Sequence, residues 1–192
     1  MSYPAPAFPV KHPQPQAPGL EVRCVRAADP AAEVLITEMG YQYLARYGPG
    51  DDLNSYRPGD FEPPAGAFLL LLEGGEPVAG GAFRRYDEDT AEFKRIWTLS
   101  SRRRQELARR MARELELAAA ACGYQRVRLT TGPRQPEARS LYLATGYTPL
   151  FDIRIDPEAI GPLAFEKELR HDPPSSDTAE SSCRCSSRCS HT

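Results

Sequence analysis

One stretch in the middle of the chain decides the fold, because a strand-like segment leads there through a basic turn into a helix: Glu92-Phe93-Lys94-Arg95-Ile96-Trp97-Thr98, then Leu99, then Ser100-Ser101-Arg102-Arg103-Arg104-Gln105-Glu106-Leu107-Ala108. The helix is predicted over residues 106–121, where apolar side chains recur on one face, at Leu107, Met111, Leu115 and Ala118. A helix N-terminus directs unpaired N–H groups and the positive end of its dipole at one place. The stretch therefore predicts an anion site at a strand–helix junction.

Upstream of this stretch the pattern predicts a strand, a helix and a hairpin. Residues 20–26 alternate with period two, as a half-buried strand does. Asp29 and Pro30 then open a helix as its N-cap and first residue. Two strands at 67–72 and 77–86 flank a Gly-rich turn, which is a hairpin pattern.

Downstream of the helix the pattern predicts a strand at 126–130, a helix at 136–145 and two strands at 147–153 and 163–169. The strand after the long helix should run parallel to the strand before it, since a helix joins them. The elements predict an α+β (mixed α/β) domain built around one sheet.

The ordered domain is expected over residues 19–170 of the 192. Residues 1–18 are rich in Pro, Ala and Gln and predict a disordered lead, and 171–192 predict a disordered tail rich in Ser and Cys. Inside the domain, residues 48–66 predict a long loop that could shape a substrate pocket or act as a lid.

The five cysteines form two groups. Cys24 and Cys122 lie in apolar patterns and are expected to be buried and reduced. Cys183, Cys185 and Cys189 lie in the tail, which is either a plain disordered extension or a segment that is oxidised, metal-bound or enzymatically modified.

Composition excludes several classes of protein. The net charge of −2 argues against a general nucleic-acid binder. No apolar run has the length of a membrane span, and the N-terminus lacks a signal-peptide pattern, so a cytoplasmic protein without membrane contact is expected. The three histidines are scattered and support neither a zinc site nor a Ser-His-Asp arrangement.

Three local matches make the chain similar to the GCN5-related N-acetyltransferase (GNAT) family. Residues 92–98 resemble the family's central strand, and 103–108 resemble its pyrophosphate loop, usually written Q/R-x-x-G-x-G/A. Residues 135–147 resemble the family's C-terminal helix and strand, with Leu141-Tyr142, three residues, then Gly146-Tyr147. The resemblance implies the GNAT-like acyl-CoA N-acyltransferase fold, with a central mixed, mostly antiparallel sheet flanked by helices.

The resemblance also implies acetyl-CoA as co-substrate, without a metal, and acetyl transfer to a primary amine of a small molecule or to an amino group. The loop agrees with that ligand, because a helix start supplies several N–H donors to a pyrophosphate. The residues that the resemblance assigns to cofactor binding are Ile96, Trp97, Thr98, Arg103, Arg104, Gln105, Glu106, Leu107, Ala108, Gln135 and Tyr142. Gln135 stands where the family commonly has Asn. A homodimer is a further expectation, since dimers are common among similar proteins.

For the chemistry, the resemblance assigns Tyr142 as the general acid near the CoA sulfur, and we expect Glu92 to be the base, acting through water. Both residues also have alternative, purely structural roles. Tyr142 could be a core aromatic residue, and Glu92 could be a solvated strand residue.

Glu106 departs from the family pattern, because it stands at the position of the loop glycine. A Cβ there obstructs close approach and left-handed dihedrals. A carboxylate about 5 Å from a phosphate charge costs about 3 kcal/mol at an effective dielectric near 20, or roughly a hundredfold in affinity. Pairing of Glu106 with Arg102 or Arg110 would reduce that cost. The alternative function is therefore a catalytically impaired CoA-binding or interaction domain.

Overall fold

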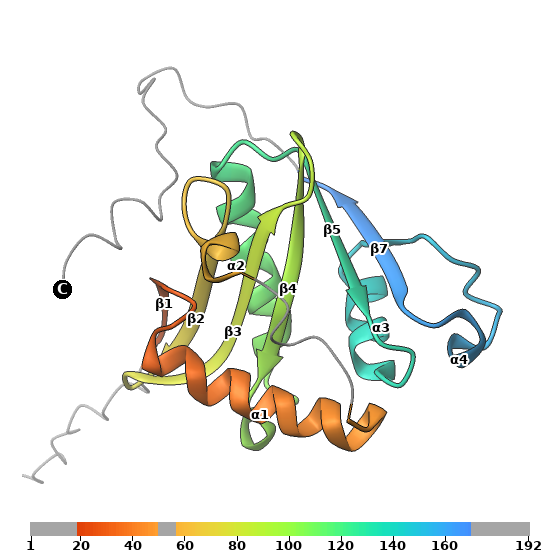
Figure 1. Cartoon of the computed structure of the whole chain (residues 1–192), viewed down its shortest axis with the longest axis horizontal. Helices are drawn as coiled ribbons and strands as arrows, with labels where there is room; N and C mark the ends of the chain where they lie inside the picture. The colour runs from red at the N-terminus through yellow and green to blue at the C-terminus, as the bar shows by residue number, and fades with distance from the viewer. Residues whose placement is uncertain (1–18, 50–56, 170–192) are drawn as a thin grey trace, which may run out of the picture.

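The computed structural model describes residues 19–49 and 57–169, and in these ranges one seven-stranded sheet carries helices on both faces (Figure 1). The strands lie in the order β1-β2-β3-β4-β5-β7-β6. Their bounds are β1 Leu20–Val25, β2 Ala67–Glu73, β3 Glu76–Arg85, β4 Thr90–Thr98, β5 Arg126–Thr131, β6 Thr148–Pro149 and β7 Leu163–Glu168. The helices are α1 Pro30–Tyr47, α2 Leu107–Ala121, α3 Pro136–Ala144 and α4 Pro157–Ile160, with the short 3₁₀ turns η1 Pro58–Phe61 and η2 Ser100–Arg102.

Strand pairing is antiparallel throughout the sheet except between β4 and β5, which are parallel. The helix α2 joins these two strands, as a parallel crossover requires. The expected mixed, mostly antiparallel sheet flanked by helices is confirmed.

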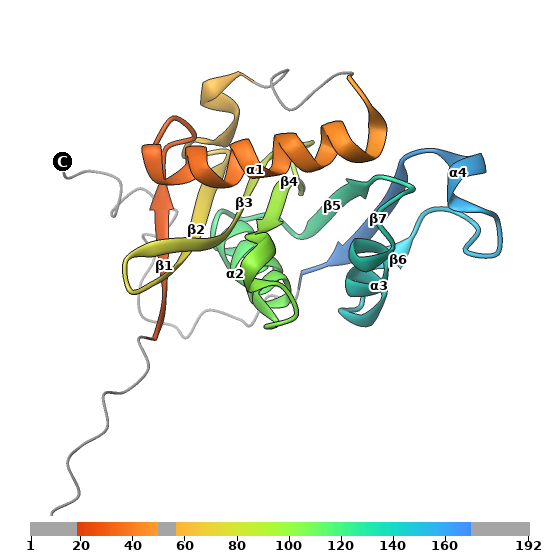
Figure 2. The same cartoon turned by 90° about the horizontal axis from the view of Figure 1, so that it is seen from below.

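Each face of the sheet carries its own hydrophobic core. Helices α2 and α3 lie on one face and α1 lies on the other (Figure 2). The α2 side packs side chains such as Phe93, Met111 and Phe165, whereas the α1 side packs Leu35 and Phe68. Both cores fill with side chains from alternate positions of the same strands, because successive strand residues point to opposite faces.

The pairing of β4 with β5 stops halfway along β4. Four residue pairs join the strands, from Thr90↔Arg126 to Phe93↔Leu129. On its other edge β4 stays paired with β3 as far as Thr98. Beyond Phe93 the two strands therefore diverge, and they leave a gap in the sheet that Figure 1 shows between β4 and β5.

A bulge in β4 accompanies this divergence. Arg95 has a φ of +55°, and the register with β3 shifts between Gly80 and Ala82. A bulge bends its strand and re-aims the side chains beyond it. Here the bulge lies at the start of the segment of β4 that no longer pairs with β5.

Three sequence predictions need correction in the described ranges. The strand predicted over 147–153 shrinks to β6, because the Asp152 carboxylate accepts from the Arg154 backbone N–H at 3.0 Å and turns the chain. The loop predicted over 48–66 contains η1, whose Phe61 is buried. Cys24 and Cys122, expected to be reduced, are disulfide-bonded.

The terminal predictions, for residues 1–18 and 171–192, lie outside the described residues, as does part of the proposed lid at 50–56. Within the described ranges, no helix combines the length and the apolar content that a membrane crossing needs.

Candidate functional site

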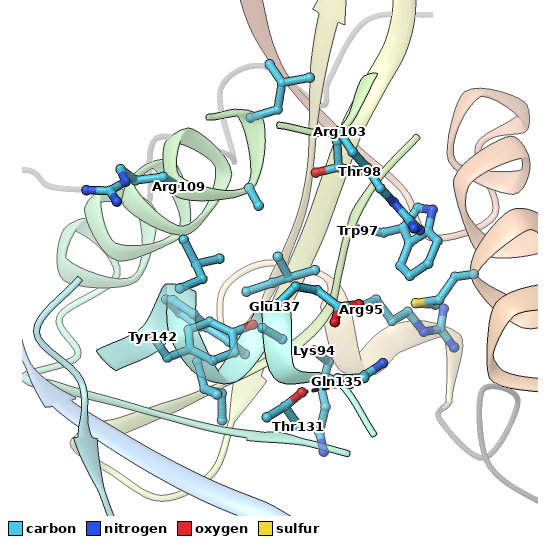
Figure 3. Close-up of a pocket in the computed structure, with 18 of the residues that line it drawn as sticks. Lys94, Arg95, Trp97, Thr98, Arg103, Arg109, Thr131, Gln135, Glu137 and Tyr142 are labelled. Atoms are coloured by element: carbon cyan, nitrogen blue, oxygen red, sulfur yellow. Dashed lines mark hydrogen bonds between the residues drawn. The ribbon is translucent and has the colours of Figure 1, made fainter. Parts of the chain in front are cut away.

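The gap between β4 and β5 opens into a pocket of about 370 Å³ (Figure 3). Its walls come from the second half of β4, the loop before α2, the end of β5 and the first turns of α3. Helix α1 contributes Met39 and Tyr43. The pocket thus passes between the strands and meets helices of both faces.

On the side of β4 that faces the pocket, no strand of the described residues pairs with β4 beyond Phe93. Lys94–Thr98 line the pocket and lie beyond the last β5 pair. An unpaired edge presents backbone N–H and C=O groups that can bind an extended amide-containing ligand as an added strand.

The loop before α2 has an unusual backbone that favours an anion. Arg104 has a φ of +61°, and Glu106, the N-cap of α2, has φ 59° and ψ 9°. Left-handed residues within a turn direct successive N–H groups into one concavity, and a helix start adds further donors. The left-handed conformation costs roughly 1–2 kcal/mol for a residue with a Cβ. Glu106 nevertheless adopts the left-handed conformation that a glycine at this position would adopt without strain.

Two of the three loop arginines are held by the body of the domain. Arg102 forms an ion pair with Glu73. Arg103 donates to Gln42 Oε1 at 2.6 Å. Its guanidinium lies 5.1 Å from the centre of the Trp97 ring, and Figure 3 shows the two side chains next to each other.

Arg104 differs from its two neighbours. It is exposed, lines the pocket, and makes no side-chain ion pair or hydrogen bond within residues 19–49 and 57–169. Its charge is therefore the one in this run of arginines that is most available to a ligand.

The Glu106 side chain lies at the pocket rim and is 76% exposed. Its carboxylate pairs with Arg109 Nε at 2.7 Å. The expected partners are otherwise engaged, since Arg102 pairs with Glu73 and Arg110 with Glu114. The prediction of Arg102 or Arg110 as the partner of Glu106 is wrong, because the pair forms with Arg109, three residues after Glu106 on the helix. This pairing and the solvent both reduce the repulsion between Glu106 and a bound phosphate.

Tyr142 lies at the α3 side of the pocket and is buried. Its ring packs against Tyr147 and Phe165, with centroids 5.4 and 5.6 Å away. Burial is the larger cause, and nearby Tyr43 the smaller, that raises the pKa of the Tyr142 phenol. The phenol therefore keeps its proton at neutral pH and can donate it.

Comparisons with known proteins agree with this geometry. The family model described as the acetyltransferase (GNAT) family matches residues 35–147, which is more than half of the chain. The chain belongs to the GNAT family. A search of curated proteins found no match.

Solved structures place the GNAT domain among acetyltransferases by fold. An acetyltransferase from Streptococcus agalactiae 2603 superposes with a TM-score of 0.63 at 19% identity, over 79% of this chain and 99% of that one. A GNAT family acetyltransferase from Elizabethkingia anophelis, solved with acetyl-CoA bound, has a TM-score of 0.54 at 16% identity, over 78% and 98%. A Bacillus subtilis acetyltransferase in complex with CoA has a TM-score of 0.56 at 13% identity, over 79% and 100%. At these identities the likeness shows the fold.

Most of the residues assigned from the sequence line the pocket of the GNAT domain. They are Ile96, Trp97, Thr98, Arg103, Arg104, Glu106, Leu107, Ala108, Gln135 and Tyr142. Gln105 and Glu92 do not line it. Gln105 instead accepts from Arg102 Nε at 3.0 Å.

Gln135 is buried at the start of α3, and its oxygen is already used. Gln135 Oε1 accepts from Thr131 Oγ1 at 2.6 Å and from the Gly132 N–H at 3.0 Å (Figure 3). These bonds tie the end of β5 to α3. The side-chain amide, a donor, is the group left for a ligand.

Glu92 is buried on β4, on the face that carries α1. Its Oε2 accepts from Arg84 at 2.9 Å, and its Oε1 lies 2.9 Å from Lys94 Nζ. Lys94 lines the pocket, so it separates the carboxylate from the cavity. A proton would reach Glu92 from the pocket only through water or past Lys94.

Sequence reasoning missed Met39 and Tyr43 of α1, Lys94 and Arg95 of β4, and Glu137 of α3, which all line the pocket. The β4 members could have been found, because they flank assigned positions in the same strand. Met39 and Tyr43 are apolar positions of helix α1, and nothing local in the sequence marks them as facing a cavity rather than a core.

Proposed function

We propose that this GNAT protein is an enzyme that transfers the acetyl group of acetyl-CoA to the primary amine of a small molecule or to an amino group. The observation that carries the proposal is the pocket-facing edge of β4 beyond Phe93, which pairs with no strand of the described residues and ends at a loop shaped for an anion. The edge suits the amides of the pantetheine arm, and the loop suits the pyrophosphate.

The cofactor-binding roles follow from where the groups lie. Ile96, Trp97 and Thr98 present their backbone to the arm, and the loop from Arg104 to Ala108 presents N–H groups to phosphate oxygens. Arg104 adds a charge-assisted contact. Gln135 offers its amide as a donor from the opposite wall.

In the reaction, the neutral amine attacks the thioester carbon, an amide bond forms and the C–S bond breaks. The Tyr142 phenol gives its proton to the departing thiolate and regains one from solvent. A backbone N–H on the β4 edge stabilises the carbonyl oxygen as it gains negative charge. The products are the N-acetyl amine and CoA.

Glu92 is proposed as the base that takes the amine's proton, acting through water. Its buried position on the central strand supports this role, while Lys94 between it and the pocket makes the water relay necessary. A cytoplasmic site of action, a homodimer and the limits of the domain at residues 19 and 170 also stay predictions.

The alternative function, a CoA-binding domain without catalysis, requires that the Cβ and carboxylate of Glu106 impair the loop. The exposed Glu106 carboxylate, its pair with Arg109 and the left-handed backbone that replaces the glycine all support a working loop instead.

A thiol-release assay with acetyl-CoA and a panel of primary amines tests the proposal. We expect release that depends on the amine, together with calorimetric binding of CoA. Tight CoA binding without amine-dependent release would favour the non-catalytic alternative. Absence of both would reject the cofactor as well.

A further inference from the structure

The C-terminal end of α1 is fastened to the turn between β5 and α3. Arg46 Nη1 donates to the Arg134 carbonyl at 3.3 Å, and Arg134 Nη1 donates to the Arg46 carbonyl at 2.9 Å. Each arginine also has a carboxylate partner, Glu137 for Arg46 and Glu158 for Arg134. The contact is therefore reciprocal and joins segments 88 positions apart.

Tyr47 and Gly132 complete this contact. The Tyr47 hydroxyl accepts from the Arg134 backbone N–H at 3.2 Å. A Cβ on Gly132 would lie 2.0 Å from the Tyr47 oxygen and 2.6 Å from the ring carbon that bears it. A larger residue at position 132 would therefore displace the Tyr47 ring from this place. We call Arg46, Tyr47, Gly132 and Arg134 the clasp.

The clasp holds α1 across the gap in the sheet. Figure 2 shows α1 running over the side of the sheet opposite α2 and α3. One turn before the clasp, Tyr43 lines the pocket, and its ring centre lies 5.6 Å from that of Tyr47. The clasp therefore fixes Tyr47, and Tyr47 limits where the Tyr43 ring can lie.

Tyr43 approaches Tyr142 from the opposite side of the pocket. The two belong to helices on different faces of the sheet, and both line the pocket. Tyr43 also contributes, after burial, to the raised pKa of Tyr142. A molecule on the α1 side of the thioester would thus contact Tyr43 while its reacting atom lies near Tyr142.

We propose that Tyr43 contacts the acceptor amine and that the clasp positions Tyr43, so that the pocket takes a slender primary amine on an unbranched arm. The inference rests on the proposed acetyl transfer. The cofactor enters from the α2 loop, which leaves the α1 side for the acceptor. An aromatic face with a hydroxyl can hold both an alkyl arm and an ammonium group, and a wall fastened at its end resists widening for a bulky arm.

Four variants test the two parts of this inference. Tyr43→Ala and Gly132→Ala should each raise the KM for the amine about tenfold, with less effect on kcat and none on the Kd for CoA. Tyr43→Phe should keep most of the affinity, since the ring remains. Tyr41→Ala is the matched control, because Tyr41 lies on the same helix but is 69% exposed and does not line the pocket.

A double-mutant cycle separates the clasp from general damage. In a Tyr47→Ala background, Gly132→Ala should have no further effect on the amine KM, because the ring it displaces is gone. If Gly132→Ala does not fold, Arg134→Ala is tested in its place. It should lower the ratio of kcat/KM for unbranched amines to kcat/KM for branched amines, and Arg154→Ala is the control.

The outcomes are distinct for the two proposals. A wild type that neither binds CoA nor releases thiol overturns the acetyl transfer and, with it, the acceptor wall. A wild type that turns over, with amine KM unchanged in Tyr43→Ala and Gly132→Ala, overturns the acceptor wall alone. Equal increases in the KM for amine and for acetyl-CoA would also overturn it, because they would show a general distortion of the pocket.

Discussion

The gap between β4 and β5 has two walls of different construction. The loop wall, residues 102–109, is built from backbone, and its shape depends on the left-handed residues Arg104 and Glu106. The α1 wall, Met39 and Tyr43 with the clasp behind them, is built from side chains that contact each other across long sequence distances. A backbone wall tolerates changes of side chain, whereas a side-chain wall depends on each residue.

If this contrast is correct, substitutions at one wall should alter binding of one substrate only. Substitutions of the proposed acid and base, Tyr142 and Glu92, should alter kcat only. The expected effects below run from the largest to the smallest.

Tyr142→Phe should lower kcat by about a hundredfold or more, the usual loss when a proton donor is removed. The ring and its packing on Phe165 remain, so the Kd for CoA and the amine KM should change little.

Because the pKa of the Tyr142 phenol is raised, the phenol stays protonated beyond its reference value of about 10. The wild-type rate should therefore not fall from loss of this proton as the pH approaches that value. Stopped-flow thiol release measures both effects. An unchanged kcat would return Tyr142 to a packing role.

Glu92→Gln should lower kcat between roughly tenfold and a hundredfold, because the amine loses its base. The KM for the amine and the Kd for CoA should change little, whereas a merely structural role for the ion pairs with Arg84 and Lys94 would change them as well. Glu166→Gln is the control, since Glu166 is a half-buried carboxylate of β7 that lies 3.9 Å from Arg128. A Glu92→Gln variant with the wild-type kcat would exclude Glu92 as the base.

Arg104→Ala should weaken CoA binding about tenfold, the usual value of a hydrogen bond to a charged group. Arg103→Ala should weaken it less, because the Arg103 guanidinium is held by Gln42 and Trp97. Calorimetry at two salt concentrations compares them, and the amine KM should not change in either variant. A larger loss for Arg103 than for Arg104 would show that the loop rearranges on binding.

Glu106→Gly should raise the free energy of unfolding by about 0.5–1 kcal/mol, because glycine adopts the left-handed conformation without strain. The lost pair with Arg109 offsets part of the gain. Thermal unfolding of Glu106→Gly and Glu106→Ala tests the cause, since alanine keeps the Cβ and should not stabilise. Equal stabilisation by both would point to charge instead of backbone strain.

The loop wall could be predicted from the sequence and the α1 wall could not. Strand, turn and helix follow one another in the chain at 92–121, so local periodicity and helix-start chemistry predict them together. The Arg46–Arg134 contact joins residues 88 positions apart, and no local pattern encodes such a pair. The partner of Glu106 was missed for a smaller reason, because the choice among neighbouring arginines depends on rotamers.

The divergence of β4 from β5 also affects the stability of the whole domain. The strands β1–β4 and β5–β7 meet along four residue pairs, with α1 fastened across the opening by the clasp. A ligand inserted between the strands would add contacts to both parts, and binding to the folded state alone stabilises it by about 2.7 kcal/mol at a hundred times its Kd. A bound acetyl-CoA would thus join two halves of one sheet, so the resistance of the protein to heat and proteolysis should follow the supply of the proposed co-substrate.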